Sequence, residues 1–331
     1  MDRFDSNLAI HFDEVDVVTE EMVLDGMDMQ AINWKAFRRD RKTYELDRAW
    51  SILQLIELWR QAYITYIKLG WAYLCLTVYS SLQEPKEMIK EDRFFTFKHG
   101  KLSERCSVGH FQLRSLLWAT SKNDVYYLRL TALISGNDET THFIDLKTMQ
   151  TKQIIQFPFP VNHAAISPDK EMLCAVGDST KTVVADINTG SEIFSIDEHH
   201  DFSFSCCWSP DGRTFATGNQ DKTTRVYDIR NTSRTLHLLG GNIGAIRSLQ
   251  YSSDGKYMVA AGMKTEAYIM YHNLHADMFS IEHIDYIHVY DAKNDYRSSQ
   301  VINLFGSIAG VSLTPDGQSL FVANSEDEDI G

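Results

Sequence analysis

The sequence predicts an all-β fold built from a repeated unit of four short antiparallel strands, with a partly helical or disordered N-terminal extension. Residues 203–208 alternate between large apolar and small side chains, which is typical of a strand with one buried face. A Ser-Pro-Asp-Gly turn follows at 209–212, and further strands are predicted at 214–218, 223–229 and 236–238. Four such strands in about forty residues form one blade of a β-propeller.

The sequence contains further copies of this unit, as a blade requires because it cannot bury its faces alone. The turn before the second strand recurs with its Asp at 169, 211, 254 and 316, at intervals of 42, 43 and 62 residues. A second Asp ends the third strand, 17 residues later in the first two copies (186 and 228) and 37 residues later in the third (291). The excess of 20 residues explains the long interval, because 62 minus 20 is 42, and it predicts an insertion within 262–285.

The repeat resembles the WD40 repeat, whose period is ~40–45 residues. Glu198-His199 stands where such repeats carry Gly-His, and Tyr227-Asp228 and Tyr290-Asp291 stand in for Trp-Asp. The resemblance implies a structural hydrogen-bond network within the predicted blade at 199–241. Its expected members are His199, Thr217, Asp221, Tyr227 and Asp228. Tyr227 departs from the pattern, because its hydroxyl reaches a different point from an indole N–H.

Longer segments resemble an uncharacterised family of fungal and plant WD-repeat proteins, over roughly two thirds of the chain. These segments are 28–34, 110–127, 157–163, 201–231 and 241–248. The resemblance implies no catalytic activity. Family members are longer between Tyr127 and Gln153, and they lack counterparts of residues 49–83 and of the insertion. We therefore expect an incomplete WD40-type propeller of about four to five blades, truncated and carrying insertions.

Composition divides the chain into four expected parts. Residues 1–32 are predicted to be an acidic disordered arm, 33–85 a helical and apolar segment, 86–109 a linker, and 110–331 the propeller. The expected blades are 110–160, 161–198, 199–241, 242–306 with the insertion, and a partial blade at 307–331.

Residues 49–83 allow three interpretations. Apolar side chains recur on one helical face from Ile52 to Tyr66, and 69–83 carry no charge. The segment is a helix docked on the propeller, a membrane span over 61–83, or an insert that folds poorly. A span would place Lys68 inside the bilayer, at a cost of ~2.5–3.5 kcal/mol near its centre.

Charge and cysteine usage exclude several functional classes. The chain carries 45 acidic and 32 basic residues, a net charge of −13, which argues against binding nucleic acid or anionic lipid. Five cysteines without metal-ligand spacing indicate reduced thiols and a cytoplasmic or nuclear protein, and the acidic start at 1–28 is unlike a secretory signal. The histidines and acids between His272 and His288 do not follow a zinc pattern. We expect no metal, cofactor or small-molecule ligand.

The sequence therefore predicts a non-catalytic scaffold for protein–protein interaction, since no arrangement of nucleophile, acid or base supports an enzyme. Two alternatives remain: a propeller tethered to a membrane through residues 61–83, and a truncated product with little function of its own. Binding is expected in the loops that connect strands on a rigid scaffold. The candidate partner-binding residues are Asp178, Asp201, Phe202, Asn219, Gln220 and Arg247.

Overall fold

The computed structural model describes twelve parts of the chain, which form two compact units. The described residues are 17–32, 34, 40–43, 89–90, 94–101, 117–119, 125–127, 139–145, 150–240, 244–263, 284–305 and 307–325. One unit comprises 1–84 with 97–104, and the other comprises 85–96 with 105–331. The predicted apolar segment at 49–83 and residues 264–283 of the insertion lie outside the described residues, so both stay predictions. Within the described ranges, no helix has the length and hydropathy needed to cross a bilayer.

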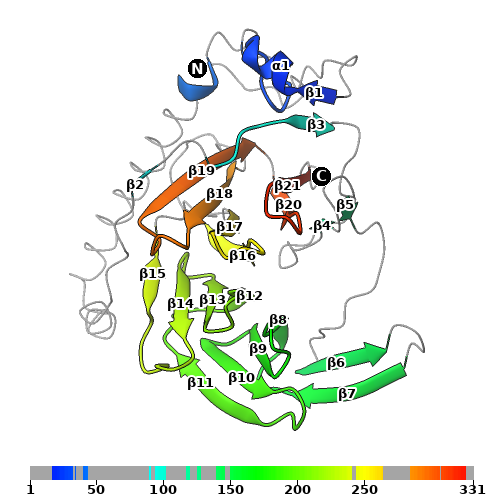
Figure 1. Cartoon of the computed structure of the whole chain (residues 1–331), viewed down its shortest axis with the longest axis vertical. Helices are drawn as coiled ribbons and strands as arrows, with labels where there is room; N and C mark the ends of the chain where they lie inside the picture. The colour runs from blue at the N-terminus through cyan, green and yellow to red at the C-terminus, as the bar shows by residue number, and fades with distance from the viewer. Residues whose placement is uncertain are drawn as a thin grey trace, which may run out of the picture. The chain divides into compact units, whose positions relative to one another are not determined.

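Among the described residues of the first unit are two short strands and a short helix, labelled in Figure 1. Strand β1 (Val17–Thr19) pairs antiparallel with β3 (His99–Lys101), and helix α1 (Glu20–Leu24) follows β1 directly. The hydroxyl of Thr19 accepts a hydrogen bond from the backbone N–H of Met22 and so caps the helix. Sequence analysis expected a disordered arm here. The structure differs because Val18 is fully buried, which gives this acidic stretch an apolar anchor.

The described residues of the second unit form β-strands and no helix, which confirms the predicted fold class (Figure 1). The first four-stranded sheet contains β8 (Val161–Ile166), β9 (Met172–Gly177), β10 (Lys181–Asp186) and β11 (Glu192–Asp197). The second contains β12 (Ser203–Trp208), β13 (Thr214–Asn219), β14 (Thr224–Asp228) and β15 (His237–Leu239). The third contains β16 (Ala245–Tyr251), β17 (Tyr257–Met263), β18 (Ile284–Asp291), β19 (Ser298–Phe305) and the added strand β2 (Ile89–Lys90).

Three smaller sheets of two strands complete the described part of this unit. They are β20 (Ser307–Leu313) with β21 (Leu320–Ser325), β4 (Leu117–Ala119) with β5 (Val125–Tyr127), and β6 (Thr140–Asp145) with β7 (Gln150–Gln156). The first strands of successive sheets contact each other in the order β8, β12, β16, β20. These four strands therefore lie innermost, as in a propeller.

The sequence period reappears as a repeated irregularity in the backbone. Each innermost hairpin has a register shift near the start of its first strand, at 161–163, 203–205, 246–248 and 308–310. The first residues of these shifts are 42, 43 and 62 positions apart, which are the intervals of the turn Asp. The four sheets are thus copies of one structural unit.

The Asp and Gly residues of the repeated turn make the contacts and adopt the backbone conformation expected of a tight turn. In the second copy the Asp211 carboxylate accepts hydrogen bonds from the backbone N–H of Arg213 and Thr214, which closes the turn between β12 and β13. Gly212 and its counterparts Gly255 and Gly317 have φ of +67° to +68°, a left-handed conformation that favours glycine. Lys170 occupies the same position in the first copy with φ +64°.

Two expected boundaries differ from the structure. The predicted blade at 110–160 consists of two separate sheets: β4 contacts β20 and β21, whereas β6 contacts β8. The predicted linker at 86–109 supplies β2 to the third blade and β3 to the other unit. Both differences arise because strand pairing depends on partners that are distant in sequence.

The core lies between neighbouring sheets. One cluster joins Cys174 and Val184 of the first blade to Trp208, Phe215 and Tyr227 of the second. Comparable clusters lie between the second and third blades and between the third blade and β20. Each blade is therefore stabilised mainly by burying its faces against the next one.

Candidate functional site

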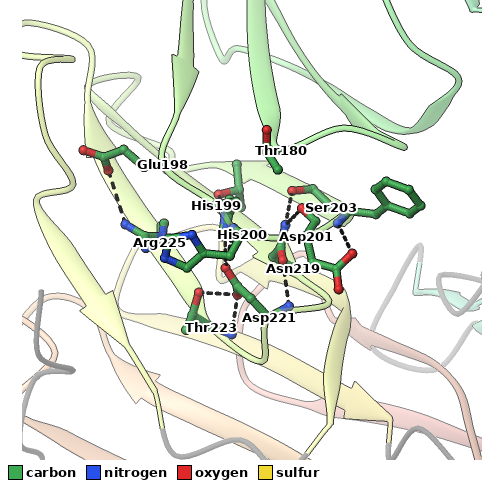
Figure 2. Close-up of polar contacts among 12 residues, drawn as sticks. Thr180, Glu198, His199, His200, Asp201, Ser203, Asn219, Asp221, Thr223 and Arg225 are labelled. Atoms are coloured by element: carbon green, nitrogen blue, oxygen red, sulfur yellow. Dashed lines mark hydrogen bonds and ion pairs between the residues drawn. The ribbon is translucent and has the colours of Figure 1, made fainter. Parts of the chain in front are cut away.

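A buried polar chain centres on His199, between β11 and β12 (Figure 2). Its Nδ1 lies 2.9 Å from Oδ2 of Asp221, and its Nε2 lies 2.8 Å from Oγ1 of Thr217. Thr217 belongs to β13, and Asp221 to the turn that follows this strand. Burial lowers the pKa of His199 below its usual 6.5, although the Asp221 carboxylate opposes this shift.

Asp221 holds the turn between β13 and β14 together. Besides His199, its carboxylate accepts hydrogen bonds from the backbone N–H of His200 at 3.2 Å and of Thr223 at 2.9 Å. The Thr223 hydroxyl donates a further bond at 2.5 Å. Burial opposes ionisation, but the bonds from His199 and Thr223 outweigh it and hold the pKa of Asp221 well below its usual range. These hydrogen bonds hold the turn in place, so the Asp221 carboxylate is not available as a general acid or base.

The two remaining members of the expected network make no hydrogen bond of standard geometry to this chain, although the Tyr227 hydroxyl lies near those of Thr217 and Thr235. Tyr227 is fully buried, with its ring centroid 5.2 Å from that of Phe215, and its hydroxyl has no hydrogen-bond partner among the described residues. Asp228 instead binds the guanidinium of Arg230 near the surface, with Oδ2 2.5 Å from an Nη atom. That contact lowers the pKa of Asp228 to about 2.

Glu198 forms a second polar group beside the first, which sequence analysis missed. Its carboxylate accepts hydrogen bonds from the backbone N–H and the hydroxyl of Thr235, and it lies 3.4 Å from the guanidinium of Arg225. Arg225 also donates to the Thr235 hydroxyl at 3.0 Å. The sequence signal for this group is the departure from the usual Gly-His pair. Glu198 replaces the glycine, and its carboxylate lies within reach of Arg225 on β14.

Four of the predicted partner-binding residues, Asp201, Phe202, Asn219 and Gln220, come together beside the start of β12; Figure 2 shows Asp201 and Asn219. The side-chain amide of Asn219 donates to the backbone carbonyl of Asp201 at 2.6 Å and to the Ser203 hydroxyl at 2.8 Å. Asn219 is fully buried, so it positions the loop and does not face solvent. Gln220 donates its backbone N–H to the Phe202 carbonyl at 2.8 Å, while the Phe202 side chain is 46% exposed.

The two other predicted residues connect this group to the neighbouring blades. The Asp178 carboxylate accepts from the amide of Asn162, which also donates to the Ser203 carbonyl at 3.1 Å. Arg247 of β16 lies with its guanidinium carbon 3.9 Å from the centre of the Phe204 ring and donates to the Gln220 amide oxygen at 3.4 Å.

We call this surface the inner-strand rim, because it surrounds the starts of β8, β12 and β16. Its members are Asp178, Asp201, Phe202 and Gln220, supported by Asn162, Asn219 and Arg247.

The structure also forms a thiol–imidazole pair that sequence analysis did not anticipate. Sγ of Cys206 lies 3.4 Å from Nδ1 of His163, 43 positions earlier, which is one repeat period. Burial opposes the thiolate, but hydrogen bonds with Cys174 and His163 outweigh it and lower the pKa of Cys206 to about 6. Cys206 is only 1% exposed, so a substrate has no access to its sulfur.

No group of three potential metal ligands occurs in the part of the chain that the structure describes. Of the histidines and acids weighed in the insertion, those from His272 to His283 lie outside the described residues. His288 is in β18, where its ring stacks on Tyr290 at 5.8 Å.

Comparison with known proteins agrees with this repeat structure. The family model "WD domain, G-beta repeat" matches residues 190–228. An uncharacterised protein of Schizosaccharomyces pombe is 27% identical over 155 residues, which cover 40% of this chain and 45% of that protein. Serine-threonine kinase receptor-associated protein of Dictyostelium discoideum is 34% identical over 100 residues (30% and 33%). Protein SOF1 of Saccharomyces cerevisiae is 26% identical over 137 residues (41% and 28%).

The aligned part of this chain thus spans less than half the length of these relatives. The matched repeat runs from the end of the first blade to the end of β14 and contains His199, Thr217 and Asp221. Residues 190–228 thus form a WD40-type repeat, and the neighbouring sheets share its strand order, register shift and turn.

Proposed function

We propose that this protein is a non-catalytic scaffold that binds protein partners through the inner-strand rim. One observation carries the proposal: Phe202 presents an exposed aromatic ring from a loop whose backbone is fixed. The Phe202 N–H donates to the Asp201 carboxylate at 2.8 Å, its carbonyl accepts from Gln220, and Asn219 holds the preceding carbonyl. Binding to a fixed loop costs little conformational entropy, and aromatic side chains often supply most of the binding energy.

The charge of the rim favours a basic partner segment. Asp178 and Asp201 carry carboxylates at this surface, and the whole chain has a net charge of −13. Such a field accelerates association with a cationic segment and weakens with added salt. The D. discoideum relative is named for association with a serine-threonine kinase receptor, and we propose protein association as the function here too. We assign no reaction to this chain.

We place this function in the cytoplasm or nucleus. Cys174, Cys206 and Cys207 are free thiols in the structure, and the reducing conditions of those compartments would preserve them.

The test is quantitative affinity purification with Phe202→Ala, followed by binding measurements between purified proteins. Ile193→Ala is the matched control, because Ile193 is 50% exposed but lies on the outer strand β11. We expect direct partners to bind at least tenfold more weakly to Phe202→Ala and unchanged to Ile193→Ala. Equal binding to the wild type and Phe202→Ala would contradict the proposal.

A further inference from the structure

The third blade carries a strand that the first two blades lack. Strand β2 pairs in parallel with β19, with Ile89 opposite Ser298 and Lys90 opposite Ser299. All other strand pairs in the described residues are antiparallel. The blades β8–β11 and β12–β15 form with four strands each, so blade formation does not require a fifth. Strand β2 therefore occupies a sheet edge as an addition to a finished blade.

Gln300 on β19 binds the backbone of the same segment with both ends of its side-chain amide. Its Nε2 donates to the Phe95 carbonyl at 2.8 Å, and its Oε1 accepts from the Phe95 N–H at 2.8 Å. Gln300 is only 7% exposed, so water does not compete for these two bonds while the segment is bound. Gln300 thus binds main-chain groups only, independent of side-chain identity.

Two consecutive phenylalanines supply the side-chain part of the contact. The ring centroids of Phe94 and Phe95 lie 5.2 Å and 5.5 Å from that of Tyr257. The ammonium of Lys256 lies 4.7 Å from the centre of the same tyrosine ring. Both phenylalanines remain partly exposed and pack against the apolar cluster between the third blade and β20. The surface is therefore suited to an aromatic pair that follows a short strand.

We propose that Tyr257, Ser298, Ser299 and Gln300 form a peptide-docking groove, here called the β19 groove. It takes an extended segment that ends in two aromatic residues. Residues 89–90 and 94–95 of this chain occupy the groove in cis, and a partner segment of the same pattern competes for it in trans. Recognition is by addition of a strand to a sheet edge, with aromatic contacts to Tyr257. The groove is separate from the inner-strand rim, so either proposal can fail without the other.

The cis segment is suited to being displaced. Its paired part is two residues long, and such short edge elements open at a small fraction of the global unfolding free energy. Tethering nevertheless gives it an effective concentration of roughly millimolar, so a free peptide should compete poorly with the intact chain. If the contacts of the cis segment are weakened, the affinity of the β19 groove for a free peptide should become measurable.

The probe is a fluorescein-labelled peptide of residues 85–97, measured by fluorescence anisotropy against full-length protein. The cis segment is weakened by Phe94→Ser with Phe95→Ser. We expect the peptide to bind this variant at least tenfold more tightly than the wild type. Adding Gln300→Ala should abolish that gain, whereas Gln318→Ala, an exposed glutamine, should preserve it. A peptide with both phenylalanines replaced by serine should not bind.

Equal binding to the wild type and the double variant, or binding that tolerates Gln300→Ala, would overturn the proposal. If the double variant does not fold, hydrogen exchange on the wild-type chain gives the answer. Excess peptide should then raise exchange in residues 85–96 while β19 stays protected. Unchanged exchange in 85–96 with saturating peptide would equally overturn it.

Discussion

The blades β8–β11 and β12–β15 share their strand order but differ in their polar groups. Both have a register shift in the inner hairpin and a glycine at the end of the second strand, Gly177 and Gly218. A Cβ would lie 1.8 Å from the Pro160 carbonyl oxygen in the first case and 2.5 Å from Ile246 in the second. The backbone plan is therefore the same in both blades.

The polar contacts of the corresponding turns are not the same. The turn after β13 is held by the buried His199–Asp221 pair, with side chains 1% and 8% exposed. The turn after β9 has an exposed bond from the Thr180 hydroxyl to the Asp197 carboxylate, at 2.6 Å. Apolar packing between sheets is therefore common to both blades. The buried polar chain occurs in β12–β15 and is replaced in β8–β11 by an exposed bond.

The largest effect should come from removing Asp221. Asp221→Ala leaves His199 and the donors of Thr223 buried without their acceptor, which should lower the free energy of unfolding by about 3 kcal/mol. Asp197→Ala, the matched change in the other blade, should cost a small fraction of that, because its bond is exposed to water. Urea denaturation of the full chain measures both. Equal losses would show that the two turns contribute alike.

The turns before β9 and β17 allow a second comparison with smaller effects on stability, because Lys170 and Gly255 occupy the same left-handed position. Gly255→Ala should cost about 1 kcal/mol, because φ +67° is strained for a residue with a Cβ. The nearest atom to that Cβ is 3.7 Å away, so the cost is conformational and not steric. Lys170→Gly relieves the same strain in the first blade and should stabilise by roughly 0.5 kcal/mol. A loss on Lys170→Gly would mean that the lysine makes a compensating contact.

The buried histidine should make stability depend on pH. Because burial lowers the pKa of His199 below 6.5, the unfolded chain binds more protons than the folded chain as the pH falls through 6.5. The contribution of His199 to stability should therefore be constant above about pH 7.5, fall as the pH decreases through 6.5, and level off below the folded pKa of His199. Asp221, whose pKa is low, stays charged throughout this window.

His199→Gln tests this assignment. The substitution should reduce the slope of unfolding free energy against pH between pH 7 and pH 5. His200→Gln, at an exposed neighbouring side chain, should leave the wild-type curve in place. An unchanged slope in His199→Gln would assign the pH dependence to another group.

Local chemistry explains what the sequence could predict. The blades β8–β11 and β12–β15 were predictable because their turns depend on a few adjacent residues, such as Asp211 and Gly212, whose bonds are short-range. The hydrogen bond between His199 and Asp221 was implied only by family resemblance, and the structure gives its length as 2.9 Å. The burial of Asn219 was not predicted, since a polar residue in a turn is usually exposed and only the loop geometry shows its two acceptors.

Long-range pairing explains what the sequence could not predict. Strand β2 lies in a charged stretch without alternation, and its partner Ser298 is far along the chain. The division of 110–160 into two sheets depends on β4 finding β20, which no local pattern encodes. The Cys206–His163 pair, in contrast, was accessible in principle, because contacts between adjacent inner strands recur at one repeat period. The Trp208 indole, which donates to the Ala165 carbonyl at 2.9 Å, shows the same separation of 43 residues.

The smallest effect should follow the removal of the Tyr227 hydroxyl, which replaces the Trp donor of the usual repeat. Tyr227→Phe keeps the ring against Phe215 and removes a buried hydroxyl that has no hydrogen-bond partner among the described residues. Deleting such a group is near neutral or slightly stabilising, so we expect a change within about 0.5 kcal/mol in urea denaturation. Phe215→Leu is the contrasting control, because it disturbs the same ring contact and should cost more. A loss above about 1 kcal/mol for Tyr227→Phe would show that the hydroxyl does substitute for the indole N–H. The polar chain of this blade would then extend from Asp221 through His199 to Tyr227, and the contrast with the first blade would be larger than the geometry indicates.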